Sequence, residues 1–189
     1  MYLIAALGNY GDKYANTRHN AGWLLLDEML GGNADWAHSK YANAEYLHDT
    51  IGDKEVEYIK PRTMMNLSGQ SVSYMVKKHE ILPAQVIVIH DDLAIPMGEL
   101  KISYNRGSGE HNGVESVTRA LGTQEYIRIR VGIGGRGLIP LKSYVLMQFS
   151  DAELQQLRDL APKLKKALKL VIEEGVEKAM NIINEKSEN

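Results

Sequence analysis

Two short runs of almost unbroken apolar residues constrain the fold of this chain more than any other feature. Residues 2–7 read YLIAAL and residues 85–89 read QVIVI. Such runs are typical of strands buried at the centre of an α/β sheet, so we expect both to be central strands. The second run leads directly into His90-Asp91-Asp92. Open α/β sheets place their ligands at the carboxyl ends of strands, which makes this position a candidate site.

The remaining sequence alternates helices with strands and adds one hairpin. Residues 44–51 and 55–59 alternate around Gly52-Asp53-Lys54, as a β-hairpin does. Ser150 and Glu153 form a capping box before a helix that Pro162 is expected to kink or divide. We also expect helices at residues 20–30, after residues 66–69, at 114–121 and at 176–183, strands at 97–104 and 126–133, and irregular structure at 33–43. The pattern predicts a single α/β domain over residues 1–189, with a twisted mixed β-sheet flanked by helices.

Length and composition indicate an ordinary soluble protein. The chain has 189 residues, of which 44% are hydrophobic and 24% are charged. No apolar run approaches the roughly 18 residues that span a bilayer, and the N-terminus has no basic leader. Cysteine is absent, which excludes disulfides, thiolate nucleophiles and cysteine-ligated zinc. We expect a cytoplasmic protein that does not interact with membranes.

Charge is distributed unevenly along the chain. The formal net charge is −2, yet residues 101–142 carry seven Lys or Arg against three Glu. Residues 1–100 carry eight basic against thirteen acidic residues. A basic, glycine-rich segment in an acidic chain is typical of a polyanion site, although an uneven solvated surface would give the same count.

Polar residues cluster at the ends of apolar segments. The clusters are Asn9, His19-Asn20, Met65-Asn66, His90-Asp91-Asp92 and His111-Asn112. Histidine can act as a base near neutral pH and needs a carboxylate or carbonyl to fix its tautomer. His19 is the candidate base, and Asp91 is the candidate carboxylate. Asparagine amides can hold a carbonyl or a water without titrating.

Each of these residues also has a simpler interpretation. His19 could be a capping or surface histidine, Asp91 and Asp92 could cap a turn, Asn66 could be a helix N-cap, and His111 could be a loop residue of no consequence. No pair of histidines has a recognised metal-ligand spacing, so we expect no metal. The glycine loop lacks the Lys-Ser/Thr ending of a P-loop, and no serine lies in a G-x-S-x-G elbow.

Taken together and in order, several motifs identify a known family. They are Leu7-Gly8-Asn9-Tyr10-Gly11, Tyr14, Thr17-Arg18-His19-Asn20-Ala21-Gly22, Pro61-Arg62-Thr63-Met64-Met65-Asn66-Leu67-Ser68-Gly69, His90-Asp91-Asp92-Leu93, Gly109-Glu110-His111-Asn112-Gly113 and Arg128-Ile129-Arg130-Val131-Gly132-Ile133-Gly134. Each motif is weak alone. Over its whole length, the chain resembles the bacterial-type peptidyl-tRNA hydrolase family.

The resemblance implies hydrolysis of the ester between a peptide and tRNA, which recycles tRNA, by a monomer without cofactor, metal or obligatory protein partner. His19 matches the general base that activates water, Asp91 the acid that orients it, and Asn9 the residue that distinguishes N-blocked from free aminoacyl-tRNA. Substrate-binding positions match Tyr14, Met64, Asn66 and Asn112. Lys101, Arg130 and Lys142 are expected to contact tRNA phosphates.

Four positions depart from the family pattern. Tyr10 replaces a proline, Met64 an aromatic residue, Glu110 a glycine and Ala94 a common aspartate. We expect these changes to alter affinity and substrate handling, and none of them alters His19 or Asp91. Two rival functions remain open from sequence. One is a non-catalytic RNA-binding relative, which the intact candidate residues disfavour. The other is an esterase or amidase on small N-acylated substrates, which the basic segment disfavours.

Overall fold

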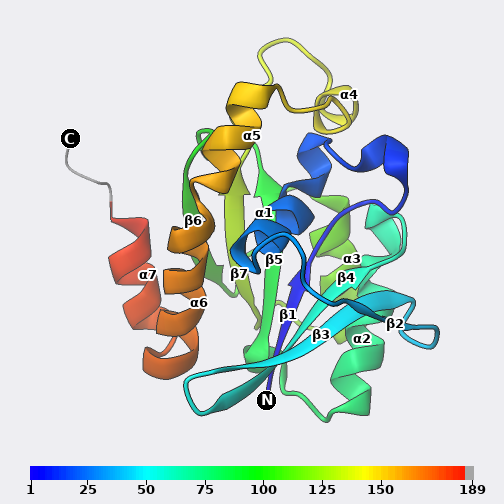
Figure 1. The fold of residues 1–189 in the computed structure, drawn as a ribbon, viewed down its shortest axis with the longest axis vertical. Coiled ribbons are helices and arrows are strands. Elements are labelled where there is room, and N and C mark those ends of the chain that lie inside the picture. The colour runs from blue at the N-terminus through cyan, green and yellow to red at the C-terminus, as the bar shows by residue number, and fades with distance from the viewer. Residues whose placement is uncertain (186–189) are drawn as a thin grey trace.

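A computed structural model describes residues 1–185 of the chain as one sheet covered by helices (Figure 1). The strands are β1 (Tyr2–Ala6), β2 (Ala37–Ser39), β3 (Ala44–Ile51), β4 (Lys54–Pro61), β5 (Val86–Asp92), β6 (Leu100–Tyr104) and β7 (Ile127–Gly132). The α-helices are α1 (Ala21–Met29), α2 (Ser68–Lys78), α3 (Asn112–Leu121), α4 (Leu141–Val145), α5 (Asp151–Arg158), α6 (Ala161–Glu174) and α7 (Val176–Asn184). None of the helices within residues 1–185 combines the length and apolar character needed to cross a bilayer.

The seven strands lie in the order β2-β3-β4-β1-β5-β7-β6. β4, β1, β5 and β7 run parallel to one another, whereas β2, β3 and β6 add antiparallel pairs at the two edges. The predicted mixed sheet is therefore confirmed. β1 and β5 are neighbours at its centre, where their apolar runs are buried on both faces, also as predicted.

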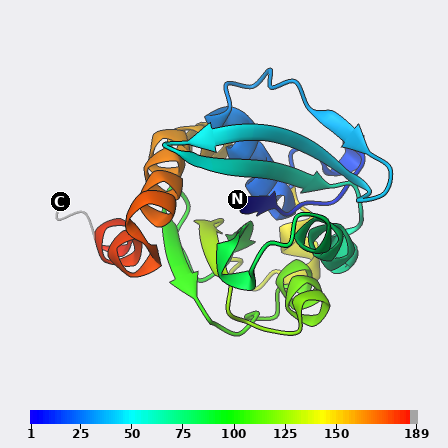
Figure 2. The ribbon, with the colours of Figure 1, turned by 90° about the horizontal axis from the view of Figure 1, so that it is seen from below.

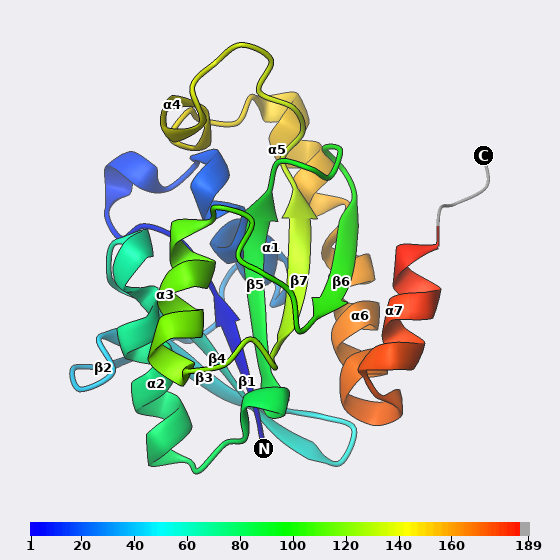
Figure 3. The same cartoon turned by 180° about the vertical axis from the view of Figure 1, so that it is seen from behind.

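Helices cover both faces of the sheet, and two apolar cores result. α1, α5, α6 and α7 lie over one face (Figure 1), and α2 and α3 lie over the other (Figure 3). Seen from below, the sheet passes between these two layers (Figure 2). The loops after β1 and β5 and the start of α3 therefore meet at one edge of the sheet.

The structure corrects several expected boundaries. Residues 33–43, expected to be irregular, include the short edge strand β2, and α4 was not expected at all. β6 begins at Leu100 instead of residue 97, because Gly98 adopts a φ of +80° in a turn before it. α3 begins at Asn112, two residues earlier than expected.

The capping box of α5 is present, with Ser150 and Glu153 bonded reciprocally. Pro162 divides the expected long helix and does not merely kink it. α5 ends at Arg158, and Pro162 lies in the first turn of α6, where its missing N–H needs no partner.

Candidate active site

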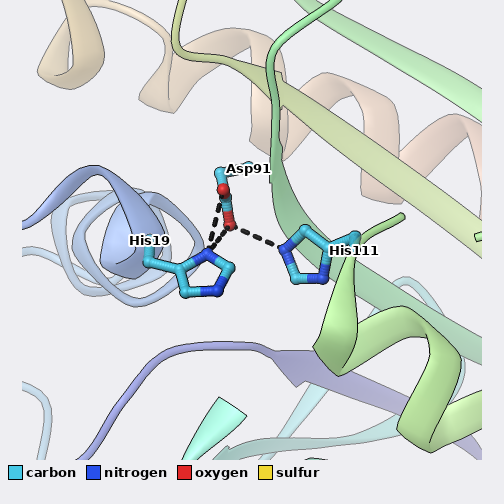
Figure 4. Close-up of side chains that lie close together, drawn as sticks. All are labelled: His19, Asp91 and His111. Atoms are coloured by element: carbon cyan, nitrogen blue, oxygen red, sulfur yellow. Dashed lines mark hydrogen bonds and ion pairs between the residues drawn. The ribbon is translucent and has the colours of Figure 1, made fainter. Parts of the chain in front are cut away.

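Three side chains from separate parts of the chain meet at the carboxyl end of β5 (Figure 4). Nδ1 of His19 lies 3.0 Å from both carboxylate oxygens of Asp91, and Nε2 of His111 lies 2.8 Å from Oδ1. Asp91 is the sixth residue of β5, His19 lies in a 3-10 turn immediately before α1, and His111 is the N-cap of α3. All three side chains are buried. The sequence predicted the meeting of His19 and Asp91.

Close packing at one glycine brings His19 to the strand ends. A Cβ atom on Gly22 would lie 2.6 Å from the backbone oxygen of Ile89 and 2.9 Å from that of Leu7. No larger residue fits there, so Gly22 allows the start of α1 to contact the ends of β1 and β5. Arg18 anchors the same turn from the other side through its ion pair with Glu153, at 2.6 Å.

Hydrogen bonds from the backbone and to Asp91 indicate which ring nitrogen of each histidine carries the proton. Nδ1 of His111 accepts hydrogen bonds from the N–H groups of Gly113 and Val114, at 3.1 and 3.2 Å, so the ring proton lies on Nε2 and is donated to Asp91. His19 donates from Nδ1 to Asp91, so Nε2 of the neutral imidazole carries no proton. That nitrogen faces away from the carboxylate (Figure 4) and can accept a proton.

The charge of Asp91 controls the titration of His19. Burial lowers the pKa of His19, but the charge and hydrogen bond of Asp91 outweigh it and raise that pKa above the ordinary 6.5. Burial alone would raise the pKa of Asp91. The two imidazoles reverse this effect and hold it well below its usual range. His90, fully buried beside them, has a lowered pKa because of burial and the nearby His111 and Arg128. Asp91 is therefore ionised whenever His19 is neutral.

Asn9 lies in the loop after β1 and is held by its neighbours. The side chain of Asn20 bonds both backbone groups of Asn9, accepting from its N–H at 2.8 Å and donating to its C=O at 3.0 Å. The N–H of Met65 donates to Oδ1 of Asn9 at 2.8 Å. Because its oxygen is occupied, Asn9 presents its Nδ2 donor, which has no hydrogen-bond partner among residues 1–185.

The predicted substrate-binding residues come from three separate segments, and no side-chain hydrogen bond joins them within residues 1–185. Asn66 is exposed and does not cap α2, whose N-cap is Leu67, so the capping interpretation is wrong. Met64 is also exposed, and Tyr14 is half-buried in the 3-10 turn Asp12–Tyr14. Asn112 opens α3 next to His111. Of the two aspartates at the end of β5, only Asp92 caps a turn, by accepting from the N–H of Ala94.

A cavity of about 490 Å³ extends from Asp91 and His111 toward α4. Against three carboxylates, five Arg or Lys side chains line it: Arg106, Arg128, Arg130, Arg136 and Lys142. Arg130 is nearly buried and donates to Asp92 at 2.8 Å, which neutralises part of its charge. Lys101 lies opposite Arg130 in the β6–β7 ladder, outside the cavity wall. Of the three residues expected to contact phosphates, Lys142 is therefore the most accessible.

Two histidines and an aspartate could also bind a metal ion, and the site contains such a set in His19, Asp91 and His111. One potential ligand atom from each lies within 4.8 Å of the others. The carboxylate of Asp91 already accepts hydrogen bonds from both imidazoles. Nδ1 of His19 and Nε2 of His111 carry the protons of these bonds. A metal would have to replace all of these bonds, so the donor set fits the hydrogen-bonded arrangement better.

Comparison with known proteins decides the family. A model of the family described as "Peptidyl-tRNA hydrolase" matches residues 3–189. The chain belongs to the peptidyl-tRNA hydrolase family. Peptidyl-tRNA hydrolases of Thermodesulfovibrio yellowstonii and Thermotoga maritima are 39% and 40% identical to it, over 97% and 96% of this chain and 99% and 96% of theirs. The crystal structure of peptidyl-tRNA hydrolase from Acinetobacter baumannii superposes with a TM-score of 0.89 at 29% identity, covering 97% of this chain and 94% of that one.

The departures from the family pattern lie around the site and leave the hydrogen bonds of Asp91 intact. Glu110 adopts a φ of +65°, a left-handed conformation that favours the glycine of the family pattern. Glu110 makes no ion pair with Arg106 in the described part of the chain. Tyr10 is exposed and stacks against Arg62.

His111 is the member of the site that the sequence left undecided. The interpretation as a loop residue of no consequence is wrong, since it caps α3 and contacts Asp91. The available signal was its place at the end of a glycine loop, directly before a helix.

Proposed function

We propose that this protein hydrolyses the ester linking a peptide to the terminal ribose of tRNA, with His19 as general base and Asp91 as its partner. The observation that carries the proposal is the contact of Nδ1 of His19 with both oxygens of the buried Asp91 carboxylate, at 3.0 Å, which leaves Nε2 of neutral His19 as a proton acceptor. Membership of the peptidyl-tRNA hydrolase family supports the choice of substrate.

The reaction then needs no covalent enzyme intermediate. A water oxygen attacks the ester carbonyl while its proton passes to Nε2 of His19, and Asp91 stabilises the imidazolium that forms. The tetrahedral intermediate collapses, the bond to the ribose oxygen breaks, and His19 returns the proton to that oxygen. An ester is an activated acyl group, so a positioned base and hydrogen-bond donors to the oxyanion can suffice.

Asn9 accounts for selection of blocked substrates. Its Nδ2 can donate to the carbonyl oxygen of an N-acylated amino group. Free aminoacyl-tRNA has an ammonium there, which presents only donors and so offers no acceptor to Asn9. The N–H of Met65 fixes the orientation of this amide, because it donates to Oδ1 and leaves Nδ2 for the substrate.

The basic cavity supplies the RNA-binding surface. Single-stranded RNA ends are bound by stacking and by contacts to phosphates, and a duplex stem offers phosphates and shape. Lys142, Arg130 and Lys101 lie at or beside this cavity and are proposed to contact phosphates.

The test is hydrolysis of N-acetyl-aminoacyl-tRNA by the purified protein in EDTA, with unblocked aminoacyl-tRNA as the comparison. We expect hydrolysis of the blocked substrate only. His19→Ala should lower kcat by about 10²–10⁴-fold, the usual contribution of a general base, with unchanged tRNA binding. His48→Ala, at an exposed histidine of β3, is the matched control. Near-normal turnover by His19→Ala would remove His19 from the mechanism, and tRNA binding without hydrolysis by the wild type would favour a non-catalytic RNA-binding protein.

A further inference from the structure

An apolar surface begins one residue beyond Asn9. It consists of Tyr10, Met64 and Leu67, which are 44%, 42% and 42% exposed, and we refer to these three residues as the Tyr10 platform. Two hydrogen bonds join the loops that carry them: the N–H of Tyr10 donates to the carbonyl of Thr63 at 3.1 Å, and the N–H of Met65 donates to Asn9. The N–H of Leu67 in turn donates to the carbonyl of Met64 at 2.9 Å. The platform is thus attached to the backbone that positions Asn9.

Arg62 adds an uncompensated positive charge to this surface. Its guanidinium carbon lies 4.3 Å from the centre of the Tyr10 ring, and it also donates to the Tyr10 hydroxyl. Its NH1 group donates to Nδ1 of His38 at 3.2 Å. No carboxylate pairs with Arg62 within residues 1–185. The aromatic ring is therefore held in place by a cation that remains available to an anionic group.

The position of the platform indicates which part of the substrate would occupy it. Asn9, Tyr10, Met64 and Leu67 all lie outside the wall of the basic cavity. An ester joins two groups that leave the reacting carbon in different directions. If RNA occupies the basic cavity, the peptide extends along the surface that starts at Asn9. Adjacent Cα atoms are about 3.8 Å apart, so a peptide carbonyl bonded to Asn9 places the neighbouring side chain within reach of Tyr10.

We propose that the Tyr10 platform and Arg62 form a subsite for the side chain of the residue preceding the ester-linked residue of the peptide. The inference rests on the proposed function. The platform offers an aromatic face and two aliphatic side chains, which favour apolar and aromatic residues. Arg62 favours an acidic residue and disfavours a basic one. Tyr10 is thus a specificity-determining residue.

The experiment uses N-acetyl-dipeptidyl-tRNAs that share one tRNA and an ester-linked alanine, with phenylalanine, glycine, aspartate or lysine before it. For the wild type we expect kcat/KM to be about three- to tenfold higher for phenylalanine than for glycine, the scale of an aromatic contact. The aspartate substrate should likewise exceed the lysine substrate. Tyr10→Ala should bring the phenylalanine-to-glycine ratio toward one, whereas Tyr10→Phe should retain it. Arg62→Gln should bring the aspartate-to-lysine ratio toward one.

Each ratio compares substrates on one variant, so a partial loss of folded protein cancels. Leu82→Ala changes an exposed leucine at the opposite end of β5 and should leave both ratios unchanged. Equal rates on all four substrates, or ratios that survive Tyr10→Ala, would overturn the subsite while leaving the proposed function intact. Absence of hydrolysis of every substrate would instead refute the proposed function, and the subsite with it.

Discussion

At the scale of single residues, the carboxylate of Asp91 is shared between two imidazoles with different tasks. His19 keeps one nitrogen unprotonated, whereas both nitrogens of His111 are occupied, one by backbone donors and one by Asp91. His111 therefore acts through Asp91 as a positioning residue. Its hydrogen bond stabilises the anion and withdraws part of its charge from His19.

Substitution of His111 separates these contributions. In His111→Asn, the amide oxygen can still cap α3, because asparagine is a good N-cap, but nothing replaces the bond to Asp91. Less of the Asp91 charge is then shared, so the pKa of His19 should rise further and the acid limb of kcat/KM should move to higher pH. We expect kcat to fall about three- to tenfold, consistent with one lost charge-assisted hydrogen bond. His111→Gln, whose amide nitrogen can replace Nε2, should restore part of the loss. An unmoved acid limb in His111→Asn would show that His111 serves the helix cap alone.

At the scale of elements, the loop between β6 and α3 joins the basic cavity to the catalytic residues. The guanidinium of Arg128 holds this loop by donating hydrogen bonds to the backbone carbonyls of Arg106 and Gly107, at 3.0 Å each. The loop then passes through Gly109 and Glu110, both with positive φ, before it reaches His111. Glu110 therefore places a carboxylate without an ion pair within residues 1–185 on the wall of a cavity whose other two acids, Asp91 and Asp92, are both paired.

Glu110→Gly is expected to tighten the binding of uncharged tRNA, chiefly at low salt. At roughly 6–8 Å and an effective dielectric near 80, one repelled phosphate corresponds to about a two- to fourfold change in affinity before salt screening. Glu80→Gly is a matched control, since Glu80 also has a positive φ (+52°) but lies at the other end of the sheet, before β5. Both variants should gain stability similarly, and only Glu110→Gly should bind tRNA more tightly. Weaker binding by Glu110→Gly at low salt would show that Glu110 supports the loop.

The elements most readily predicted were those whose signal is local. Residues 2–7 and 85–89 indicated central strands because burial on both faces removes polar residues from a strand. Ser150 and Glu153 marked the start of α5 because the bonds of a capping box join two residues only three positions apart in the sequence. β2 and α4, with three and five residues, are too short to show a period and are held by their neighbours.

At the scale of the whole molecule, strand order determines the parts of the site that the sequence could not show. β7 lies between β5 and β6, although it follows both in the chain. Because β7 lies next to β5, Arg130 lies beside His90 and donates to Asp92. Between β6 and β7 the chain passes through α3, whose N-cap His111 contacts Asp91. By contrast, His19 lies shortly after the first predicted central strand and Asp91 lies at the end of the second, and family motifs marked both. The uneven charge was visible in the sequence, and the fold gathers five basic side chains around one cavity.

The most direct test of the central claim is the pH dependence of kcat/KM for N-acetyl-aminoacyl-tRNA in the wild type and in Asp91→Asn. The base must be neutral to accept a proton, so wild-type activity should rise with pH through a pKa above the ordinary 6.5 of histidine. Asp91→Asn removes the charge that raises this pKa and leaves the burial that lowers it. Its acid limb should therefore shift to lower pH, with kcat reduced by up to about 10⁴-fold because the imidazolium and its tautomer lose their support. An acid limb at the same pH in both proteins would contradict the pairing of His19 with Asp91.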